Sequence, residues 1–405
     1  SSMARVALLG ALDPFASTAL PETRELTPLE LGGSAVVAKF NEDGSLLAVG
    51  CRDGRVILCD FMTRNVIRNM TAHFLPITSI GWSPCNKQIY STSADWSLII
   101  WDILNGTVHK KFYFNGPILH AQIHPKDENI FVVCPLVDPV VILNVRTEER
   151  QPLVKGAGGI GSAAYSPNGE FLMLGNNKGV ISVINSVTYK VERTFKVKGG
   201  ASVKFIQFDR TGNHVVINSS DKVLRVYSKN TKGIWEGTNE IIDSINRLQW
   251  KCACFSSDSD YVFAGNAERA AHNIYYWMRE YRDIAGTLEG PKEGVLNIEW
   301  HPKQSILLSI STSGATYVWK PNTVIHWSAF APDFLELEEN VTYTEREDEL
   351  DIVSEEEESE NMTDEEEHVD VVNLSDDEGS YVLPSVPDAD TDVPDFFKDI
   401  LRAGQ

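Results

Sequence analysis

The sequence predicts an all-β chain, in which a seven-bladed β-propeller is followed by an extended acidic C-terminal tail. Two short motifs that recur at one period predict the propeller, and an abrupt change of charge near residue 336 predicts the tail. The chain has 405 residues, of which 42% are hydrophobic. This composition is sufficient for a sizeable buried core.

The first motif consists of an aromatic residue or Ile at the end of a short strand, a polar turn and a second hydrophobic strand. It recurs seven times, at steps of 41 to 47 residues. Its first residue stands at Phe40, Trp82, Ile123, Tyr165, Phe208, Phe255 and Trp300. A nearly constant step of this kind indicates an internal repeat.

The second motif marks the end of another strand, at steps of 41 to 50 residues. It stands at Cys59-Asp60, Trp101-Asp102, Leu143-Asn144, Ile184-Asn185, Tyr227-Ser228, Trp277-Met278 and Trp319-Lys320. A shared period of about 40–45 residues is typical of the WD40 repeat, in which each repeat forms a four-stranded blade. Because each blade buries its faces only against its neighbours, we expect the seven blades to close into a ring.

One repeat keeps the unmodified dipeptide Trp101-Asp102. Its other polar members are His73, Ser91, Ser93 and Asp95. In WD-repeat proteins such a set forms an internal hydrogen-bonded network, so we expect His73 and Asp95 to be structural rather than catalytic. In other repeats the turn carboxylate is kept at Asp53 and Asp221 and is replaced at Ala271 and Ser313.

Closing the ring requires a strand from one end of the chain to complete a blade at the other end. The segment from Arg24 to Leu31 precedes the first motif and is the candidate, so the propeller is expected over 24–326. Two steps are long, which predicts excursions over roughly Lys229 to Arg247 and Ala267 to His272. Loops on a rigid scaffold commonly carry binding functions.

Residues 1–23 are expected to form an N-terminal docking segment. Its apolar run Val6–Leu12 is short and is followed at once by Asp13-Pro14, which argues against a signal peptide. No run approaches the roughly 20 apolar residues of a membrane helix. The six cysteines form no C-x-x-C pair, and we expect them to be buried free thiols of an intracellular protein.

The net charge of −21 comes almost entirely from the C-terminal part of the chain. From Glu336 to Gln405 there are 26 acidic residues against only Arg346, Lys398 and Arg402, a net charge of −23. The remainder therefore carries +2. Electrostatic repulsion from DNA is therefore expected of the acidic tail but not of the near-neutral propeller.

Motifs for catalysis are absent from the sequence. It holds no P-loop, no nucleophile elbow and no metal-ligand spacing among His and Cys. The glycine-rich run Gly156–Gly161 precedes a strand rather than a helix, so we expect a loop between blades. We therefore expect no enzymatic activity, no cofactor and no metal site.

The stretch from Trp327 to Asp351 begins with three aromatic residues, Trp327, Phe330 and Phe334, and then becomes acidic, with eight acidic residues from Glu336 to Asp351. Its first half is too apolar to remain in water, and its second half is too charged to be buried in its own core. Such a segment is expected where a folded domain ends and a partner-binding tail begins.

This stretch closely resembles the family of retinoblastoma-binding protein five and its fungal counterpart in the COMPASS complex. The similar residues are Trp327–Phe334, Glu336–Val341, Tyr343 and Glu345–Asp351, and Leu12–Ala16 also resembles the fungal members. The resemblance covers the propeller, the hinge and part of the tail. It implies a nuclear, non-catalytic WD40 subunit of SET-domain methyltransferase complexes that act on the fourth-residue lysine of histone H3.

The resemblance also implies the partners of residues 327–353 and of the tail. The SET-domain contacts would be Ser328, Phe330, Pro332, Asp333, Phe334, Glu336, Asn340 and Tyr343. The contacts with the SPRY-domain subunit would be Glu345, Arg346, Glu347, Leu350 and Asp351. The second WD40 propeller subunit would contact Glu367, Val369, Asp370 and Val371. Alternating carboxylates on an extended segment are suited to Arg or Lys on a basic partner surface.

The resemblance further implies a contact between the propeller and the nucleosome. The candidate contacts with DNA phosphates lie in or near loops of the later blades, at Arg225, Arg247, Lys251 and Arg269. Residues 354–379 combine low hydrophobicity with high charge and are expected to be disordered in isolation. Residues 380–405 include a candidate short helix. The alternative function is a WD40 substrate receptor of a ubiquitin ligase, although no adaptor-binding box is visible.

Overall fold

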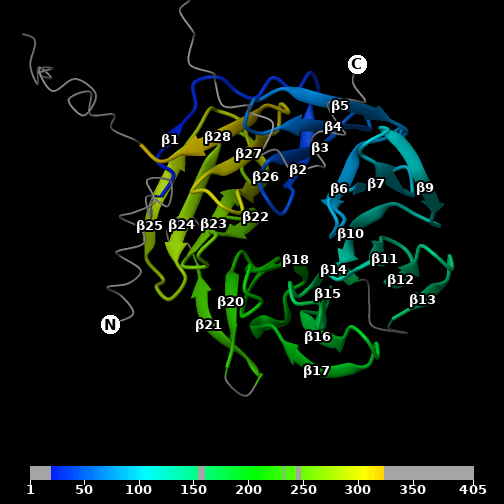
Figure 1. Cartoon of the computed structure of the whole chain (residues 1–405). Coiled ribbons are helices and arrows are strands. Elements are labelled where there is room, and N and C mark those ends of the chain that lie inside the picture. Colours follow the sequence, from blue (N-terminus) through cyan, green and yellow to red (C-terminus); the bar gives the residue numbers. More distant parts are fainter. Residues whose placement is uncertain (1–19, 154–159, 231–232, 243–247, 323–405) are drawn as a thin grey trace, which may run out of the picture. The chain divides into compact units, whose positions relative to one another are not determined.

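The computed structural model describes residues 20–153, 160–230, 233–242 and 248–322. They form 28 β-strands in seven four-stranded antiparallel sheets. These sheets stand as blades around a central axis (Figure 1). Within the described ranges the single helical element is the 3-10 turn η1 (Lys198–Gly200). The prediction of an all-β, seven-bladed propeller is confirmed.

We number the blades in chain order of their innermost strands. Blade 1 consists of β2 (Ala35–Phe40), β3 (Leu46–Cys51), β4 (Arg55–Asp60) and β5 (Val66–Thr71). Blade 2 consists of β6 (Ile77–Trp82), β7 (Gln88–Ser93), β8 (Ser97–Asp102) and β9 (Thr107–Tyr113). Blade 3 consists of β10 (Ile118–His124), β11 (Asp127–Pro135), β12 (Val141–Asn144) and β13 (Arg150–Pro152).

The remaining blades follow the same order. Blade 4 consists of β14 (Ile160–Tyr165), β15 (Phe171–Asn176), β16 (Val180–Asn185) and β17 (Val191–Lys196). Blade 5 consists of β18 (Val203–Phe208), β19 (His214–Ser219), β20 (Leu224–Lys229) and β21 (Trp235–Ile241). Blade 6 consists of β22 (Trp250–Phe255), β23 (Tyr261–Asn266), β24 (Asn273–Met278) and β25 (Ile284–Glu289). Blade 7 consists of β26 (Val295–Trp300), β27 (Leu307–Ser311), β28 (Thr316–Lys320) and β1 (Thr23–Arg24).

Both sequence motifs mark fixed positions in the blades. The first motif falls at or next to the end of each innermost strand, as at Phe40 in β2 and Trp300 in β26. The second motif falls at the end of the third strand, as at Trp101 in β8. The period of the sequence is therefore the period of the fold.

The hydrophobic core lies between blades rather than inside any one of them. One cluster joins Tyr90 and Phe112 of blade 2 to Phe131 and Leu143 of blade 3. Because a blade is covered on both faces, its second strand is buried without alternation, and all six residues of β3 are buried. Each blade depends on its neighbours for burial, which is why the sheets must close into a ring.

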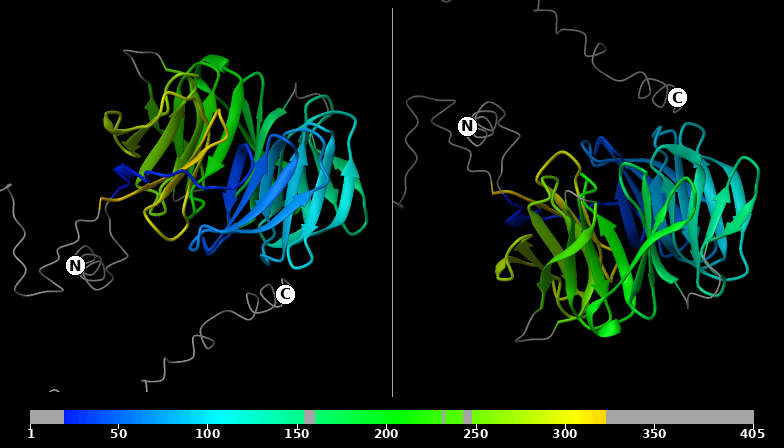
Figure 2. Two further views of the ribbon diagram at one scale, coloured as in Figure 1. Left: turned by 90° about the horizontal axis from the view of Figure 1, so that it is seen from above. Right: turned by 90° about the horizontal axis from the view of Figure 1, so that it is seen from below.

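The ring closes where the first described strand completes the last blade. Thr23 pairs with Lys320 and Arg24 with Trp319. Backbone bonds extend this pairing on both sides, from Glu22 N to Lys320 O (3.0 Å) and from Leu29 N to Thr316 O (2.9 Å). Figures 1 and 2 show the first blade (blue) beside the last (yellow).

The predicted closing segment, Arg24 to Leu31, thus completes blade 7, but its start at residue 24 was too late. Glu22 and Thr23 already bond to β28, and Leu20 packs against the cluster of blades 6 and 7. The closing strand pairs mainly through backbone groups. Its side chains therefore carry little sequence pattern from which the start of the strand could be predicted. The predicted end of the propeller at residue 326 lies outside the described residues.

The two predicted excursions have different outcomes. Ala267 to His272 connect β23 to β24 as predicted. The excursion over Lys229 to Arg247 was wrong for Trp235–Ile241, because these residues form β21, the outermost strand of blade 5. Of the run Gly156–Gly161, only its last two residues are described, and they begin β14.

The cysteines follow the prediction with one exception. All six are free thiols, and five of them are buried, but Cys85 is exposed. No helix among the described residues is long and apolar enough to span a membrane.

Candidate interaction surfaces

One face of the ring gathers two sets of connections. Because neighbouring strands are antiparallel, the start of each innermost strand lies at the same face as the turn between the second and third strands. We call this the top face. It carries the loops that lead into the innermost strands and the turns such as β7–β8 and β19–β20.

Each innermost strand has a register shift at its second residue, as between Ala35 and Val37 in β2. The residue skipped by the shift is left unpaired, and such a bulge redirects its side chain. The skipped residues are Val36, Thr78, Leu119, Gly161, Lys204, Lys251 and Leu296. They occupy equivalent positions around the axis, next to the top face.

Lysine occupies this position in two adjacent blades, at Lys204 in blade 5 and Lys251 in blade 6, and both side chains are exposed. Exposed cations on the top face of the same blades come from Lys198 of η1, Lys222 of the β19–β20 turn and Arg269 of the β23–β24 loop. We call these five residues the basic sector. The sector can present several positive charges to one anionic ligand.

The structure places the predicted phosphate contacts in different locations. Lys251 and Arg269 lie in the basic sector, and Arg247 lies outside the described residues. Lys204 was missed, although it stands four residues before Phe208 as Lys251 stands four residues before Phe255. Alignment of the repeats on the first motif would have found it.

Arg225 lies next to the β19–β20 turn, as predicted, but its side chain is buried. It lies in β20 with 5% of its surface exposed. Its Nη2 contacts Asp221 Oδ2 at 2.5 Å, and its Nη1 donates to Ser219 Oγ at 2.6 Å. Burial alone raises the pKa of Asp221, but hydrogen bonds from Arg225 and Ser219 outweigh burial, so this pKa lies below its usual value. The guanidinium is thus bonded to Asp221, Ser219 and the carbonyl of Lys198, and its charge is already paired.

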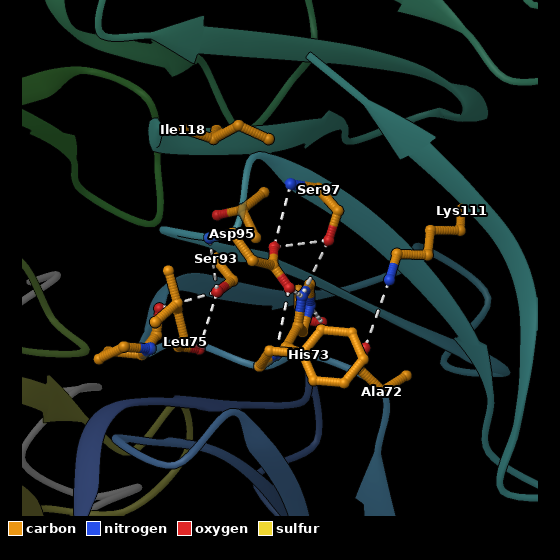
Figure 3. Close-up of polar contacts among 12 residues, drawn as sticks. Ala72, His73, Leu75, Ser93, Asp95, Ser97, Lys111 and Ile118 are labelled. Atoms are coloured by element: carbon orange, nitrogen blue, oxygen red, sulfur yellow. Dashed lines mark hydrogen bonds and ion pairs between the residues drawn. The ribbon is translucent and has the colours of Figure 1, made fainter. Parts of the chain in front are cut away.

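Blade 2 contains a continuous chain of side-chain hydrogen bonds, of which Figure 3 shows the part around His73, Asp95 and Ser97. Trp101 Nε1 donates to Ser91 Oγ at 2.7 Å, and Ser91 Oγ lies 2.8 Å from His73 Nε2. His73 Nδ1 lies 2.9 Å from Asp95 Oδ2, and Ser97 Oγ donates to Asp95 Oδ1 at 2.6 Å. The chain ties the third strand to two loops of the top face.

The pKa of His73 is lowered, because burial disfavours the imidazolium more strongly than Asp95 favours it. A neutral His73 donates from Nδ1 to Asp95 and accepts at Nε2 from the Ser91 hydroxyl. All members of the chain are thus satisfied, and the predicted internal role of His73 and Asp95 is confirmed. Ser93 bonds instead to the carbonyl groups of Leu75 and Pro76.

Blade 7 contains a shorter version of this chain. Trp319 Nε1 donates to Ser309 Oγ at 2.8 Å, and Ser309 Oγ lies 2.7 Å from His272 Nε2. The histidine comes from the β23–β24 loop of blade 6. Among the described residues no side chain bonds to its Nδ1, and Ser313, which stands where blade 2 has Asp95, donates to Glu293. Burial lowers the pKa of His272 to about 4.

A second contact across the closure joins blades 1 and 7 at their innermost strands. Lys39 Nζ of β2 lies 2.8 and 2.7 Å from the two carboxylate oxygens of Glu299 of β26. Burial raises the pKa of Glu299, and Lys39 counteracts this effect. The ion pair supplements the pairing of β1 with β28 on the outside of the ring.

The residues assigned to the SET domain, the SPRY-domain subunit and the second propeller lie between Ser328 and Val371, outside the described residues. Among the residues that are described, no group of three or more His, Cys, Asp or Glu side chains could hold a metal ion. The described residues form a closed ring of seven blades, with charged and apolar side chains exposed on its top face.

The chain is similar to several known proteins. The family described as the WD40 domain of anaphase-promoting complex subunit 4 matches residues 27–85. The retinoblastoma-binding protein 5 homolog of Drosophila melanogaster is 38% identical, over 81% of this chain and 70% of that protein. The Set1 complex component swd1 of Schizosaccharomyces pombe is 32% identical, over 86% of this chain and 90% of that protein.

Two further comparisons agree. The COMPASS component SWD1 of Saccharomyces cerevisiae is 30% identical, over 78% of this chain and 81% of that protein. The crystal structure of the Cps50 (Swd1) β-propeller domain of Myceliophthora thermophila superposes with a TM-score of 0.68 and 25% identity. It covers 74% of this chain and 99% of the solved chain.

The fold and its internal networks define a WD-repeat β-propeller protein. The similarity over most of the chain is more specific than this class. The chain belongs to the family of retinoblastoma-binding protein 5 homologues and Swd1.

Proposed function

We propose that the protein is a non-catalytic WD40 scaffold and activating subunit of a Set1- or COMPASS-type complex that methylates histone H3 in the nucleus. The observation that carries this proposal is the similarity, over 78% and 86% of the chain, to proteins named as COMPASS and Set1 complex components. The charge distribution supports it, because a near-neutral part of the chain precedes 70 residues with a net charge of −23.

In this proposal residues 328–343 bind the SET domain, and Phe334 and Glu336 supply the main contacts. A mobile catalytic domain is active for only part of the time, and a partner that binds its competent state raises the population of that state. A tenfold shift requires about 1.4 kcal/mol of differential binding. Residues 345–351 then bind the SPRY-domain subunit, and residues 367–371 bind a second propeller.

The test is methylation by the assembled complex with the double variant Phe334→Ala and Glu336→Ala. We expect methylation to fall about tenfold, because the competent state of the SET domain loses its support. The unfolding temperature of the propeller should not change. The matched control is Val382→Ala with Asp388→Ala, which lies outside the implied contacts. Unchanged methylation by the Phe334 and Glu336 variant would refute the activating role.

A pull-down separates the scaffold proposal from the ubiquitin-ligase alternative. The full chain should retain the SET and SPRY subunits, and a variant that lacks residues 325–372 should lose them. Retention of a cullin adaptor in place of these subunits would favour the alternative.

The basic sector supports a further part of the proposal, a contact with DNA phosphates of the nucleosome. Lys204, Lys251 and Arg269 are exposed on the top face of adjacent blades. Charge reversal of all three should reduce the salt dependence of nucleosome binding by a log–log slope of roughly 2–3. Lys126→Glu, at the exposed β10–β11 turn of the opposite face, is the control. An unchanged slope would exclude the contact.

A further inference from the structure

Five apolar side chains are exposed on the top face of blades 2 and 3. The exposed fractions are 84% for Phe74, 47% for Leu75, 49% for Trp96, 57% for Leu136 and 73% for Val137. We call these residues the apolar sector. They come from the β5–β6 loop and the β7–β8 and β11–β12 turns. Apolar side chains gathered on one face mark an interaction site more often than scattered ones do.

Contacts between the loops hold the residues of the apolar sector on neighbouring, connected loops. Phe74 N donates to Asp95 Oδ2 at 3.3 Å, next to Trp96 in the chain. Trp96 O accepts a bond of 2.9 Å from the backbone of the β9–β10 loop. In that loop Gly116 lies against Val137, whose side chain a Cβ on the glycine would approach to 3.1 Å. The loops are held together before any ligand binds, so binding requires little ordering.

The backbone of Trp96 adopts a conformation that disfavours its side chain, as does that of Lys222 at the equivalent position of blade 5. Trp96 is the third residue of its turn and has a φ of 69°. The equivalent residues of three other turns are glycines, Gly54, Gly179 and Gly314, with φ of 87°, 73° and 93°. A left-handed conformation disfavours a bulky side chain and suits glycine. Blade 2 thus keeps a half-exposed tryptophan where glycine would fold with less strain.

A basic groove adjoins the apolar sector along the outer strand of blade 2. It has a volume of about 320 Å³ and is lined by Lys110, Lys111, Phe112, Tyr113, Glu148 and Arg150. Two cations flank the apolar sector: Lys111 Nζ lies 5.7 Å from the centre of the Phe74 ring, and across β9 the Arg150 guanidinium lies 4.7 Å from the centre of the ring of Phe114, whose N donates to Trp96 O. Figure 3 shows Lys111 directed towards Ala72, whose carbonyl it contacts at 3.3 Å. Three cations against one carboxylate give the groove a net positive charge.

We propose that the apolar sector and this groove form one docking site for an acidic segment of a partner protein. An apolar anchor of the segment packs against Phe74 and Trp96. Carboxylates that flank the anchor meet Lys111 and Arg150, where the ammonium and guanidinium groups can donate charge-assisted hydrogen bonds. The proposal is independent of the methyltransferase assignment, because the site lies on blades 2 and 3 and uses none of residues 328–371.

The test measures binding of a fluorescein-labelled peptide to the full-length protein by fluorescence anisotropy. The peptide contains a Leu-Phe pair flanked by aspartates and glutamates, and a second peptide replaces its acidic residues by lysines. The acidic peptide should bind, and Trp96→Gly and Lys111→Glu should each weaken binding by about tenfold or more. Trp96→Gly should not lower the unfolding temperature, since glycine suits this conformation. Val187→Ser removes an 83% exposed valine from a blade 4 turn and should leave binding unchanged.

Three results would overturn the proposal. One is equal binding of the acidic and the lysine-substituted peptides. Another is acidic-peptide binding that Trp96→Gly leaves unchanged. The third is a concentration-dependent dimer, seen by light scattering and lost in Trp96→Gly, which would show that a second copy of the chain covers the surface.

Discussion

Blades 2 and 7 each contain a Trp–Ser–His chain of hydrogen bonds, but the histidine comes from a different loop in each blade. Each buries a tryptophan indole N–H that bonds to a serine ten residues earlier, and in each the serine meets a buried histidine. In blade 2 the histidine belongs to the loop before the blade and ends on Asp95. In blade 7 it is His272, supplied by the loop of blade 6, and no side chain of the described residues bonds to its Nδ1.

This comparison shows that a histidine meets the same serine position in both blades, although the histidine comes from a different place in the chain. The comparison also shows what the Asp95 carboxylate contributes to the chain of hydrogen bonds. Asp95 completes the chain in blade 2, whereas no described side chain extends the blade 7 chain beyond His272. We therefore expect the two blades to respond differently to matched substitutions.

The largest effect is expected from Ser91→Ala, because it leaves Trp101 Nε1 and His73 Nε2 buried without partners. The free energy of unfolding should fall by about 2–4 kcal/mol, measured by urea denaturation. Ser309→Ala is the matched change in blade 7 and should cost less, since no described side chain extends the chain there beyond His272. A larger loss for Ser309→Ala would contradict the comparison.

The acid itself is tested by Asp95→Ala against Ser313→Ala. Asp95 accepts from His73 and from both the backbone and the hydroxyl group of Ser97, so its loss should cost about 1–3 kcal/mol. Ser313 donates to the exposed Glu293. Its removal should change stability by less than about 0.5 kcal/mol. If Asp95→Ala and Ser313→Ala lowered the unfolding temperature by similar amounts, the Asp95 carboxylate would add no more stability to blade 2 than Ser313 adds to blade 7.

The pH dependence of stability compares the two histidines directly. The pKa of His272 falls from 6.5 to about 4 on folding, so the unfolded chain binds the proton more tightly. Stability should therefore be full above pH 6.5 and be lost as the pH falls towards about 4, by on the order of 2 kcal/mol. His272→Gln should reduce this loss between about pH 7 and about pH 4.5. Because burial also lowers the pKa of His73, some acid sensitivity should remain. An identical pH profile for wild type and His272→Gln would contradict this account.

The smallest effect is expected from Ser313→Asp, which gives blade 7 the turn carboxylate of blade 2. Bonding to His272 Nδ1 should raise the free energy of unfolding by no more than about 1 kcal/mol, since Glu293 repels the new charge. The same change with Glu293→Gln should give a larger gain. No gain in either background would show that the turn of blade 7 does not direct the carboxylate inward.

The sequence by itself determined the number of blades, their order and the internal set of blade 2. These features are local or periodic: strand endings such as Phe40 and Trp101 repeat with the blade, and His73 and Asp95 keep the spacing of the WD repeat. The contacts assigned to residues 328–371 stay predictions, since they rest on resemblance alone.

Only the tertiary structure decided which polar and apolar side chains are available to partners. Arg225 looked like a surface cation until β20 brought it against Asp221. The register shifts place Lys204 and Lys251 at equivalent unpaired positions of adjacent blades, and the structure shows that both side chains are exposed. Trp96 became informative once its φ could be set beside those of three glycines. The physical reason is that spacing along the chain fixes which strand a residue occupies, whereas burial, pairing and charge depend on neighbours that packing brings from other blades.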